Sequence, residues 1–325
     1  MKVCVYFNPN KQSEIYEGVR LIKNIKGALN LHGIPYAKNL NDSYDIAHFI
    51  SLDDELAINE IKKRNIPVVF SALSCENDET AKILFEGELT LKAKRVLNKV
   101  DCILVADEAS RKLLIEQGIT AWIEVVSPGV NVSRFEFSES YKENIFYDYV
   151  RLNKDQKFVK FVSSKDDKKQ RAIVINIAKK CPKINFFYIG AKKIRHHNIF
   201  RKSLPKNLKF YPLLSNELYC SMMKKTSAFV SVDNSNHSPI TIIDASAGKT
   251  PIVAMKPLGL NKELLDNVGA LIAENEIEVA NYINSIVEGN VATNEEKGFE
   301  YAKENSLFKL GEQLIEIYKS LLDGR

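Results

Sequence analysis

The residues best placed to do chemistry lie in one polar loop and in the helix predicted directly after it. Ser238 can cap this helix through its hydroxyl, and Pro239 suits the first helical position. The backbone amides of Ile240 and Thr241 would then form a positive helix end, which favours an anion such as a diphosphate. Asp244 lies about one turn further on and could accept hydrogen bonds from ribose hydroxyls. An ordinary capped helix without a ligand fits the same pattern.

The composition is that of a globular protein with two domains. The chain has 325 residues, of which 45% are hydrophobic and 27% are charged. No run of about 18 apolar residues occurs, so no membrane-spanning helix is expected. The start of the chain lacks the pattern of an export signal, which makes the cytoplasm the expected location. The five cysteines are scattered and are expected to be reduced structural thiols.

The net charge of +5 is unevenly distributed. The first 150 residues hold 18 Lys+Arg and 22 Asp+Glu, a net charge of −4, and the remainder holds 28 and 19, a net charge of +9. A basic second half favours a ligand that carries phosphate or an acidic surface. A solvated lysine-rich surface would give the same balance.

Short apolar runs alternate with helical patterns along the whole chain. Strands are predicted at 2–7, 44–49, 67–70, 102–105, 122–126, 158–162, 185–189, 208–211, 228–232 and 251–254, and helices at 16–32, 53–64, 80–98, 107–117, 169–180, 216–224, 239–247, 276–287, 294–304 and 308–322. The polar stretch 127–157 interrupts the series and is the expected linker. This order predicts an α/β fold with two doubly wound parallel sheets, whose ligands bind at the carboxyl ends of the strands.

The loop and helix around Asp244 resemble the signature of the family 4 retaining glycosyltransferases. That pattern is a Glu, seven residues, a second Glu and then Ala-x-Ala-x-Gly-x-Pro-Val-Val-Ala. Asp244 falls on the second acid, and the following matches are Ala245, Ala247, Pro251, Val253 and Ala254, with Gly248 displaced by one position. The resemblance implies that Asp244 holds the ribose of the donor and that Asn236, at the position of the first acid, contacts the transferred sugar.

Weaker similarities to this family extend over nearly the whole chain. Two of them lie early in the chain: Glu17-Gly18-Val19, at the position of a glycine-rich loop, and Tyr44-Asp45-Ile46-Ala47-His48. The others are the stretches 67–76 and 106–114, and Val126-Ser127-Pro128-Gly129-Val130-Asn131 followed by Phe135. The bacterial enzymes that glycosylate diacylglycerol are the most similar group. The implied architecture is the GT-B fold, in which two Rossmann-like domains face each other across a cleft.

Three polar positions of the family site are altered in this chain. The family histidine falls at Leu73, the family arginine of the diphosphate pair at Ser164, and the first acid at Asn236. Lys169 keeps the lysine of the pair, and Lys165 or Lys168 could replace the missing charge. A solvated run of charges is the alternative for these lysines. Since lost charges at a leaving diphosphate slow catalysis by orders of magnitude, the changes count against activity but not against the fold.

The resemblance implies a retaining glycosyltransferase that moves a sugar from a UDP-sugar to a lipid or glycan acceptor, without a metal or other cofactor. Residues 1–140 would form the acceptor-side domain, 141–305 the nucleotide-sugar domain, and 306–325 a helix that packs back on the first domain. Lys169 and Asp244 are the candidate catalytic residues. The candidate donor contacts are Gly18, Ser164, Lys168, Asn236, His237, Ser238, Ile240 and Thr241.

Two other functions stay open. The first is a catalytically silent homologue that serves as an accessory or binding subunit of an active transferase, with a protein partner or a second copy. The second is an unrelated two-domain α/β binding protein. The basic stretch with Lys92, Lys94, Arg95 and Lys99 could meet anionic lipid at the inner face of the membrane or could be a solvated helix. No nucleic-acid motif occurs.

Overall fold

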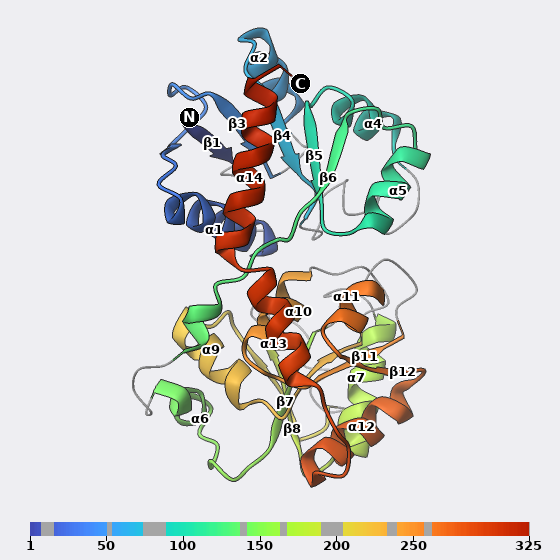
Figure 1. Cartoon of the computed structure of the whole chain (residues 1–325). Helices are drawn as coiled ribbons and strands as arrows, with labels where there is room; N and C mark the ends of the chain where they lie inside the picture. Colours follow the sequence, from blue (N-terminus) through green and yellow to red (C-terminus); the bar gives the residue numbers. More distant parts are fainter. Residues whose placement is uncertain are drawn as a thin grey trace. The chain divides into compact units, whose positions relative to one another are not determined.

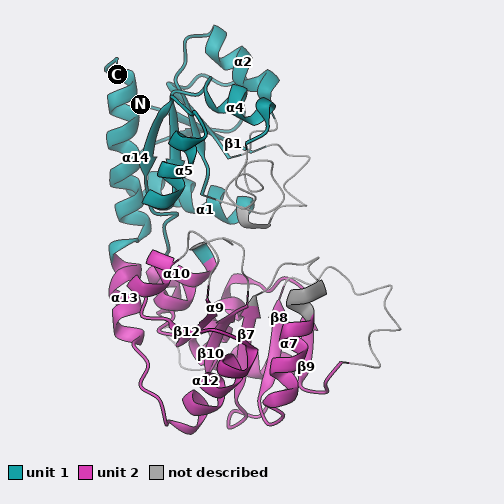
Figure 2. Ribbon diagram, turned by 90° about the vertical axis from the view of Figure 1, so that its right-hand side faces the viewer, with its two compact units in different colours: residues 1–131, 236–240, 304–325 teal, residues 132–235, 241–303 magenta. Residues whose placement is uncertain are grey.

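The chain folds into two compact α/β units (Figure 1). The computed structural model describes residues 1–7, 16–50, 54–73, 89–136, 142–162, 168–189, 204–232, 239–256 and 262–324. Unit 1 comprises residues 1–131, 236–240 and 304–325, and unit 2 comprises residues 132–235 and 241–303 (Figure 2). The chain therefore enters unit 2 between Asn131 and Val132.

Unit 1 is built around a parallel sheet. Its described strands are β1 (Val3–Tyr6), β2 (Tyr36–Ala37), β3 (Ile46–Phe49), β4 (Val68–Ser71), β5 (Cys102–Val105) and β6 (Trp122–Val125), in the order β2-β1-β3-β4-β5-β6. The residues of β3, β4 and β5 are all buried. Strands that are buried on both faces appear in a sequence as continuous apolar runs. These strands could therefore be predicted from the sequence pattern.

Helices cover both faces of this sheet. The described helices of unit 1 are α1 (Tyr16–Leu31), α2 (Glu55–Lys63), α4 (Leu91–Leu97), α5 (Glu108–Glu116) and α14 (Leu307–Leu322). The C-terminal helix α14 lies beside α1 across one face of the sheet (Figure 1) and buries Leu310, Leu314 and Tyr318 in the core of unit 1. At Gly311 the two helices come so close that an added Cβ would stand 2.9 Å from the Ala28 carbonyl oxygen.

A buried polar cluster lies inside the otherwise apolar core of unit 1. The imidazole of His48 is fully buried, with Nδ1 at 2.6 Å from the Tyr318 hydroxyl and Nε2 at 2.6 Å from Ser71 Oγ. Burial lowers the pKa of His48 from its ordinary value of 6.5 to about 3. The imidazole is therefore neutral, and its two nitrogens join β3 to β4 and to α14.

Unit 2 repeats the architecture with a second parallel sheet. Its described strands are β7 (Phe158–Val162), β8 (Asn185–Ile189), β9 (Leu208–Tyr211), β10 (Ala228–Ser231), β11 (Ile252–Met255) and β12 (Leu271–Ala273), in the order β12-β11-β10-β7-β8-β9. The described helices are α6 (Ile145–Val150), α7 (Lys168–Lys180), α9 (Asn216–Lys225), α10 (Pro239–Ala247), α11 (Lys262–Asn267), α12 (Glu276–Glu288) and α13 (Glu295–Glu304), although the first two residues of α10 and the last residue of α13 are grouped with unit 1.

The core of unit 2 has two main groups of packed side chains. The helices α7 and α12 pack together, and their Ile177, Val279 and Ile283 join Phe161 and Val230 of the sheet in one hydrophobic cluster. A second group consists of aromatic rings. Phe146 of α6 stands with its ring centroid 5.2 Å from that of Phe158 and 5.4 Å from that of Phe187.

Several sequence-based expectations about the elements need correction. The stretch 127–157 is not a plain linker, since it contains the 3-10 turns η1 (Val132–Phe135) and η2 (Lys142–Asn144) and the helix α6. The first domain ends at Asn131 rather than at residue 140, and the last part of the chain joins unit 1 from residue 304. The strands β2 and β12 and the helix α11 were not predicted.

The helix expected at 80–98 also differs. Its described part starts at Leu91, because the Thr90 side chain accepts a hydrogen bond from the Ala93 amide at 3.1 Å and caps the helix there.

Candidate functional site

The switch point of the unit 2 sheet lies between its two central strands. From β7 the chain turns first to β8 on one side, and it later returns to β10 on the other side of β7. Parallel strands bring their carboxyl ends to one edge, so the segments that follow β7 and β10 leave the sheet side by side. In open α/β sheets a ligand binds in the crevice outside such a switch point.

Both segments that the sequence singles out for phosphate begin at this edge. The helix α7 follows β7 and starts at Lys168, so Lys168 and Lys169 are its first two residues. The helix α10 follows β10 and starts at Pro239, as predicted. The structure thus brings these two helix starts to neighbouring strands. Ser164, between β7 and α7, lies outside the described residues.

The first turn of α10 contains two of the predicted donor contacts. Ile240 is 1% exposed and Thr241 is 8% exposed, so their side chains belong to the protein interior. A contact with a diphosphate would therefore come from their backbone amides, which lie at the positive end of the helix. The predicted contacts Asn236, His237 and Ser238 precede the described part of α10 and lie outside the described residues.

Asp244 is held by two residues from other parts of unit 2. Its Oδ2 lies 2.7 Å from Arg134 Nη2 of η1 and accepts a hydrogen bond at 3.1 Å from the hydroxyl of Tyr219 of α9. The side chain of Asp244 is 2% exposed and that of Arg134 is 18% exposed. Because a charge buried in this way is costly unless it is paired, Arg134 is the counterion that stabilises the carboxylate.

Sequence reasoning missed both partners of Asp244. Arg134 immediately precedes Phe135, which belongs to the family resemblance, but its neighbours Ser133 and Glu136 are polar and gave no signal that it is mostly buried. Tyr219 lies in the predicted helix at 216–224 and gave no signal of its own.

Two further predicted positions lie in unit 1. Gly18, at the position of the family's glycine-rich loop, lies buried in the first turn of α1, which begins at Tyr16 as the sequence predicted. Leu73, at the position of the family histidine, is 1% exposed and packs in the apolar cluster of unit 1. Its burial agrees with the apolar character of the residue and gives it no polar role.

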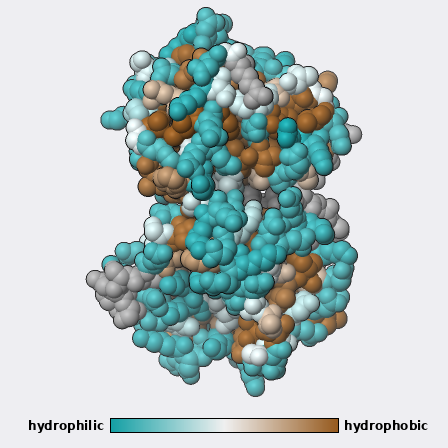
Figure 3. Space-filling view, in the orientation of Figure 1, coloured by the Kyte–Doolittle hydropathy of each residue, from teal (hydrophilic) through white to brown (hydrophobic). Residues whose placement is uncertain are grey.

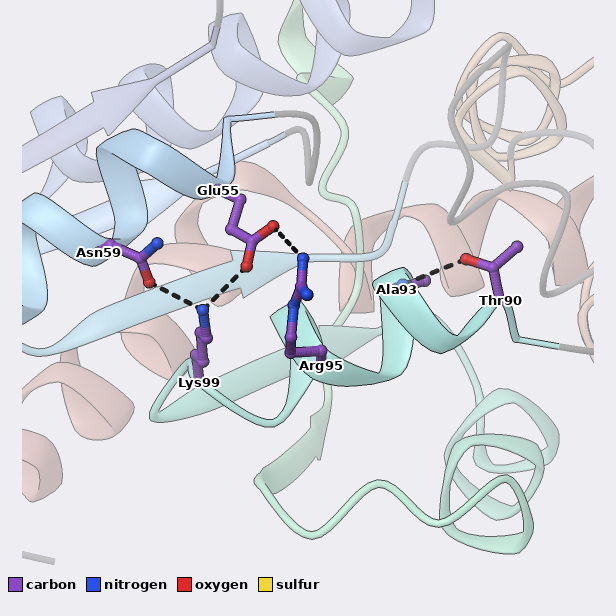
Figure 4. A network of polar contacts seen from close by, with 6 residues as sticks. All are labelled: Glu55, Asn59, Thr90, Ala93, Arg95 and Lys99. Atoms are coloured by element: carbon purple, nitrogen blue, oxygen red, sulfur yellow. Dashed lines mark hydrogen bonds and ion pairs between the residues drawn. The ribbon is translucent and has the colours of Figure 1, made fainter.

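The basic stretch that includes α4 is partly neutralised within unit 1. Glu55 of α2 accepts hydrogen bonds from Lys99 Nζ at 2.8 Å and from Arg95 Nη2 at 2.8 Å, and Asn59 Oδ1 accepts a second bond from Lys99 (Figure 4). The hydrogen bonds from Lys99 and Arg95 lower the pKa of Glu55 to about 2. Two of the four cations considered for lipid contact are thus paired with a carboxylate.

Apolar residues also reach the surface of unit 1. They form patches on the face shown in Figure 3, with hydrophilic residues between them. Leu56 at the start of α2 is 79% exposed, and Leu91 at the start of α4 is 87% exposed. In the part of the chain that the structure describes, no helix is long and apolar enough to cross a bilayer, and no cluster of three or more His, Cys, Asp or Glu could hold a metal ion.

Comparison with known proteins agrees with this geometry. Residues 146–305 match the family "Glycosyl transferases group 1". The chain is 22% identical to the processive diacylglycerol alpha-glucosyltransferase of Acholeplasma laidlawii over 335 residues, which cover 99% of each chain.

Solved structures share the fold over nearly the full length. HepE from Anabaena, crystallised with UDP and glucose, superposes with a TM-score of 0.75 at 17% identity and covers 98% of this chain and 100% of its own. A glycosyltransferase from Rickettsia africae superposes with a TM-score of 0.69 at 14% identity and covers 100% and 99%. The two parallel sheets are therefore those of a GT-B fold.

Proposed function

We propose that the chain transfers a sugar from a UDP-sugar to a lipid acceptor of the diacylglycerol type, with retention at the anomeric carbon, since residues 146–305 match the group 1 glycosyltransferases and the full chain is similar to a diacylglycerol glucosyltransferase. The observation that carries the donor assignment is the position of the starts of α7 and α10, on adjacent central strands at the switch point of the unit 2 sheet.

The roles of the residues follow from the charge that develops during transfer. As the glycosidic bond to the diphosphate breaks, positive character grows on the sugar and negative charge on the leaving phosphate. Lys169, with Lys168 beside it, supplies positive charge at the start of α7, and the amides of Ile240 and Thr241 supply the positive end of α10. In this proposal Asp244 holds the ribose, and no metal is required.

The proposed acceptor follows from the relative that acts on diacylglycerol, together with the surface of unit 1. A diacylglycerol acceptor lies in a bilayer, so the protein must approach the membrane surface. The exposed Leu56 and Leu91 and the lysines at 92 and 94 offer apolar and cationic groups of the kind that bind there. A glycan acceptor is the alternative that the same assay distinguishes.

The test is transfer of radiolabelled glucose from UDP-glucose to vesicles that contain diacylglycerol, with product extracted into organic solvent. Lys169→Ala should lower the rate by about 10²–10³-fold, the usual cost of removing one group that stabilises a developing charge. Lys179→Ala is the matched control, because Lys179 is exposed near the far end of the same helix.

The outcome also decides between an enzyme and an accessory subunit. Label in the lipid fraction that depends on Lys169 and not on Lys179 supports the proposal. Label in a water-soluble glycan acceptor instead would keep the donor and change the acceptor. No product with UDP-glucose, UDP-galactose or UDP-N-acetylglucosamine and any acceptor tried would contradict catalysis by this chain and favour the accessory role.

A further inference from the structure

The partners of Asp244 form a compact cluster within unit 2. Arg134 comes from η1, the first turn after the chain enters this unit, and Tyr219 from α9. Both contact the same oxygen, Oδ2, at 2.7 Å and 3.1 Å. Because only 2% of the Asp244 side chain is exposed, these partners rather than water determine where its oxygens lie.

The guanidinium of Arg134 also lies close to two aromatic rings. Its central carbon lies 4.9 Å from the ring centroid of Phe135 and 5.5 Å from that of Tyr219. A planar guanidinium can stack on aromatic rings and bind a carboxylate at the same time, whereas a lysine ammonium offers a point charge on a flexible stem. Tyr219 therefore acts twice, through its hydroxyl on Asp244 and through its ring on Arg134.

From this geometry we infer that Arg134 and Tyr219 are positioning residues of the ribose subsite, which act through the carboxylate of Asp244. This inference rests on the proposed function. It identifies the residues that make the donor site selective for the ribose of the nucleotide. A carboxylate can accept about four hydrogen bonds, and in this proposal the hydroxyls of a bound ribose are among the donors to Asp244. With the carboxylate held in one orientation, the 2′-hydroxyl is recognised at a defined point.

The orientation matters because a hydrogen bond weakens steeply when its angle departs from the preferred range. Without Arg134 the Asp244 side chain would lose its counterion and its fixed rotamer together. The expected consequence is a loss of selectivity for ribose over deoxyribose, beyond any general loss of affinity. A role limited to stabilising the fold would leave that selectivity unchanged in the protein that remains folded.

The test compares the binding of UDP and 2′-deoxy-UDP by calorimetric titration. The wild-type protein should prefer UDP by about 10-fold or more, the range expected for one hydrogen bond to a charged group. In Arg134→Met the preference should fall to roughly 2-fold, because the positioned acceptor is lost. Arg134→Lys should keep only part of the preference for UDP. The control variant Arg111→Met, at a half-exposed arginine of unit 1, should keep the wild-type preference.

A variant that keeps the aromatic ring of Tyr219 distinguishes a loss of positioning from a loss of folding. Tyr219→Phe removes only the hydroxyl and should lower the preference with little change in the melting temperature. Equal weakening of both nucleotides in the Arg134 and Tyr219 variants would overturn the inference, as would equal binding of both nucleotides by the wild type. If the wild type binds neither nucleotide, the proposed function fails first, and the inference fails with it.

Discussion

The buried imidazole of His48 makes the stability of unit 1 depend on pH in a direction that the structure determines. Burial lowers its pKa to about 3, whereas the unfolded chain should titrate near 6.5. Below pH 6.5 the imidazole of His48 becomes protonated in the unfolded state, whereas it stays neutral in the folded state. The free energy of unfolding therefore falls as the pH falls from 6.5 towards 3, and this contribution is fully present above pH 6.5.

The size of this change in the free energy of unfolding follows from the uptake of one proton by the unfolded chain. Each pH unit within the window costs about 1.4 kcal/mol, so the His48 contribution lowers the free energy of unfolding by about 2 kcal/mol between pH 7 and pH 5. In His48→Gln the side chain still offers a donor and an acceptor but does not titrate. The variant should be less stable than the wild type at pH 7, and the difference should shrink by about 2 kcal/mol at pH 5.

Urea unfolding at a series of pH values provides the assay. The single tryptophan of the chain, Trp122, packs against the core cluster of unit 1 that also contains Tyr318, so its fluorescence reports on this unit. Tyr318→Phe is the control, because it removes the hydroxyl beside His48 and leaves the imidazole buried. It should lose stability at every pH with the slope of the wild type. Parallel pH profiles for the wild type and His48→Gln would refute the reasoning.

Two further predictions concern unit 1. Gly311→Ala should lower the free energy of unfolding by about 1–3 kcal/mol, since the new Cβ would stand 2.9 Å from the Ala28 carbonyl oxygen. Unchanged urea unfolding would show that α1 and α14 are not packed this closely. Glu55→Gln removes the carboxylate shared by Arg95 and Lys99, and it should increase cosedimentation with phosphatidylglycerol vesicles in a manner that added salt reverses. Binding equal to wild type at low salt would exclude these cations from a lipid contact.

The sequence predicted the parts of the fold that depend on local pattern. Parallel strands buried on both faces gave continuous apolar runs, and most described strands were located from them. The helix α10 was predicted with its observed bounds because Pro239 suits a first helical position and a Gly-Lys-Thr-Pro turn follows it. The predicted helix at 80–98 includes α4, but its start at Leu91 was not predicted, because the cap by the Thr90 side chain was not recognised.

The sequence could not predict contacts between residues far apart in the chain. Arg134 and Asp244 are 110 positions apart, and no local pattern links a 3-10 turn to the middle of a later helix. The bond between His48 and Tyr318 spans 270 positions. The short elements β2, α11 and β12 depend on tertiary packing, since two, six and three residues carry too little periodicity to be recognised.

The central claim is that unit 2 binds a UDP-sugar at the switch point of its sheet, and calorimetric titration with UDP and UDP-glucose tests it most directly. The wild type should bind both ligands saturably, and Asp244→Asn and Lys169→Ala should each weaken binding at least about 10-fold, the cost of one hydrogen bond to a charged group. Asp148→Asn, at an exposed carboxylate of the same unit, should bind like the wild type. Absence of binding at millimolar nucleotide, or binding that neither substitution weakens, would contradict the claim.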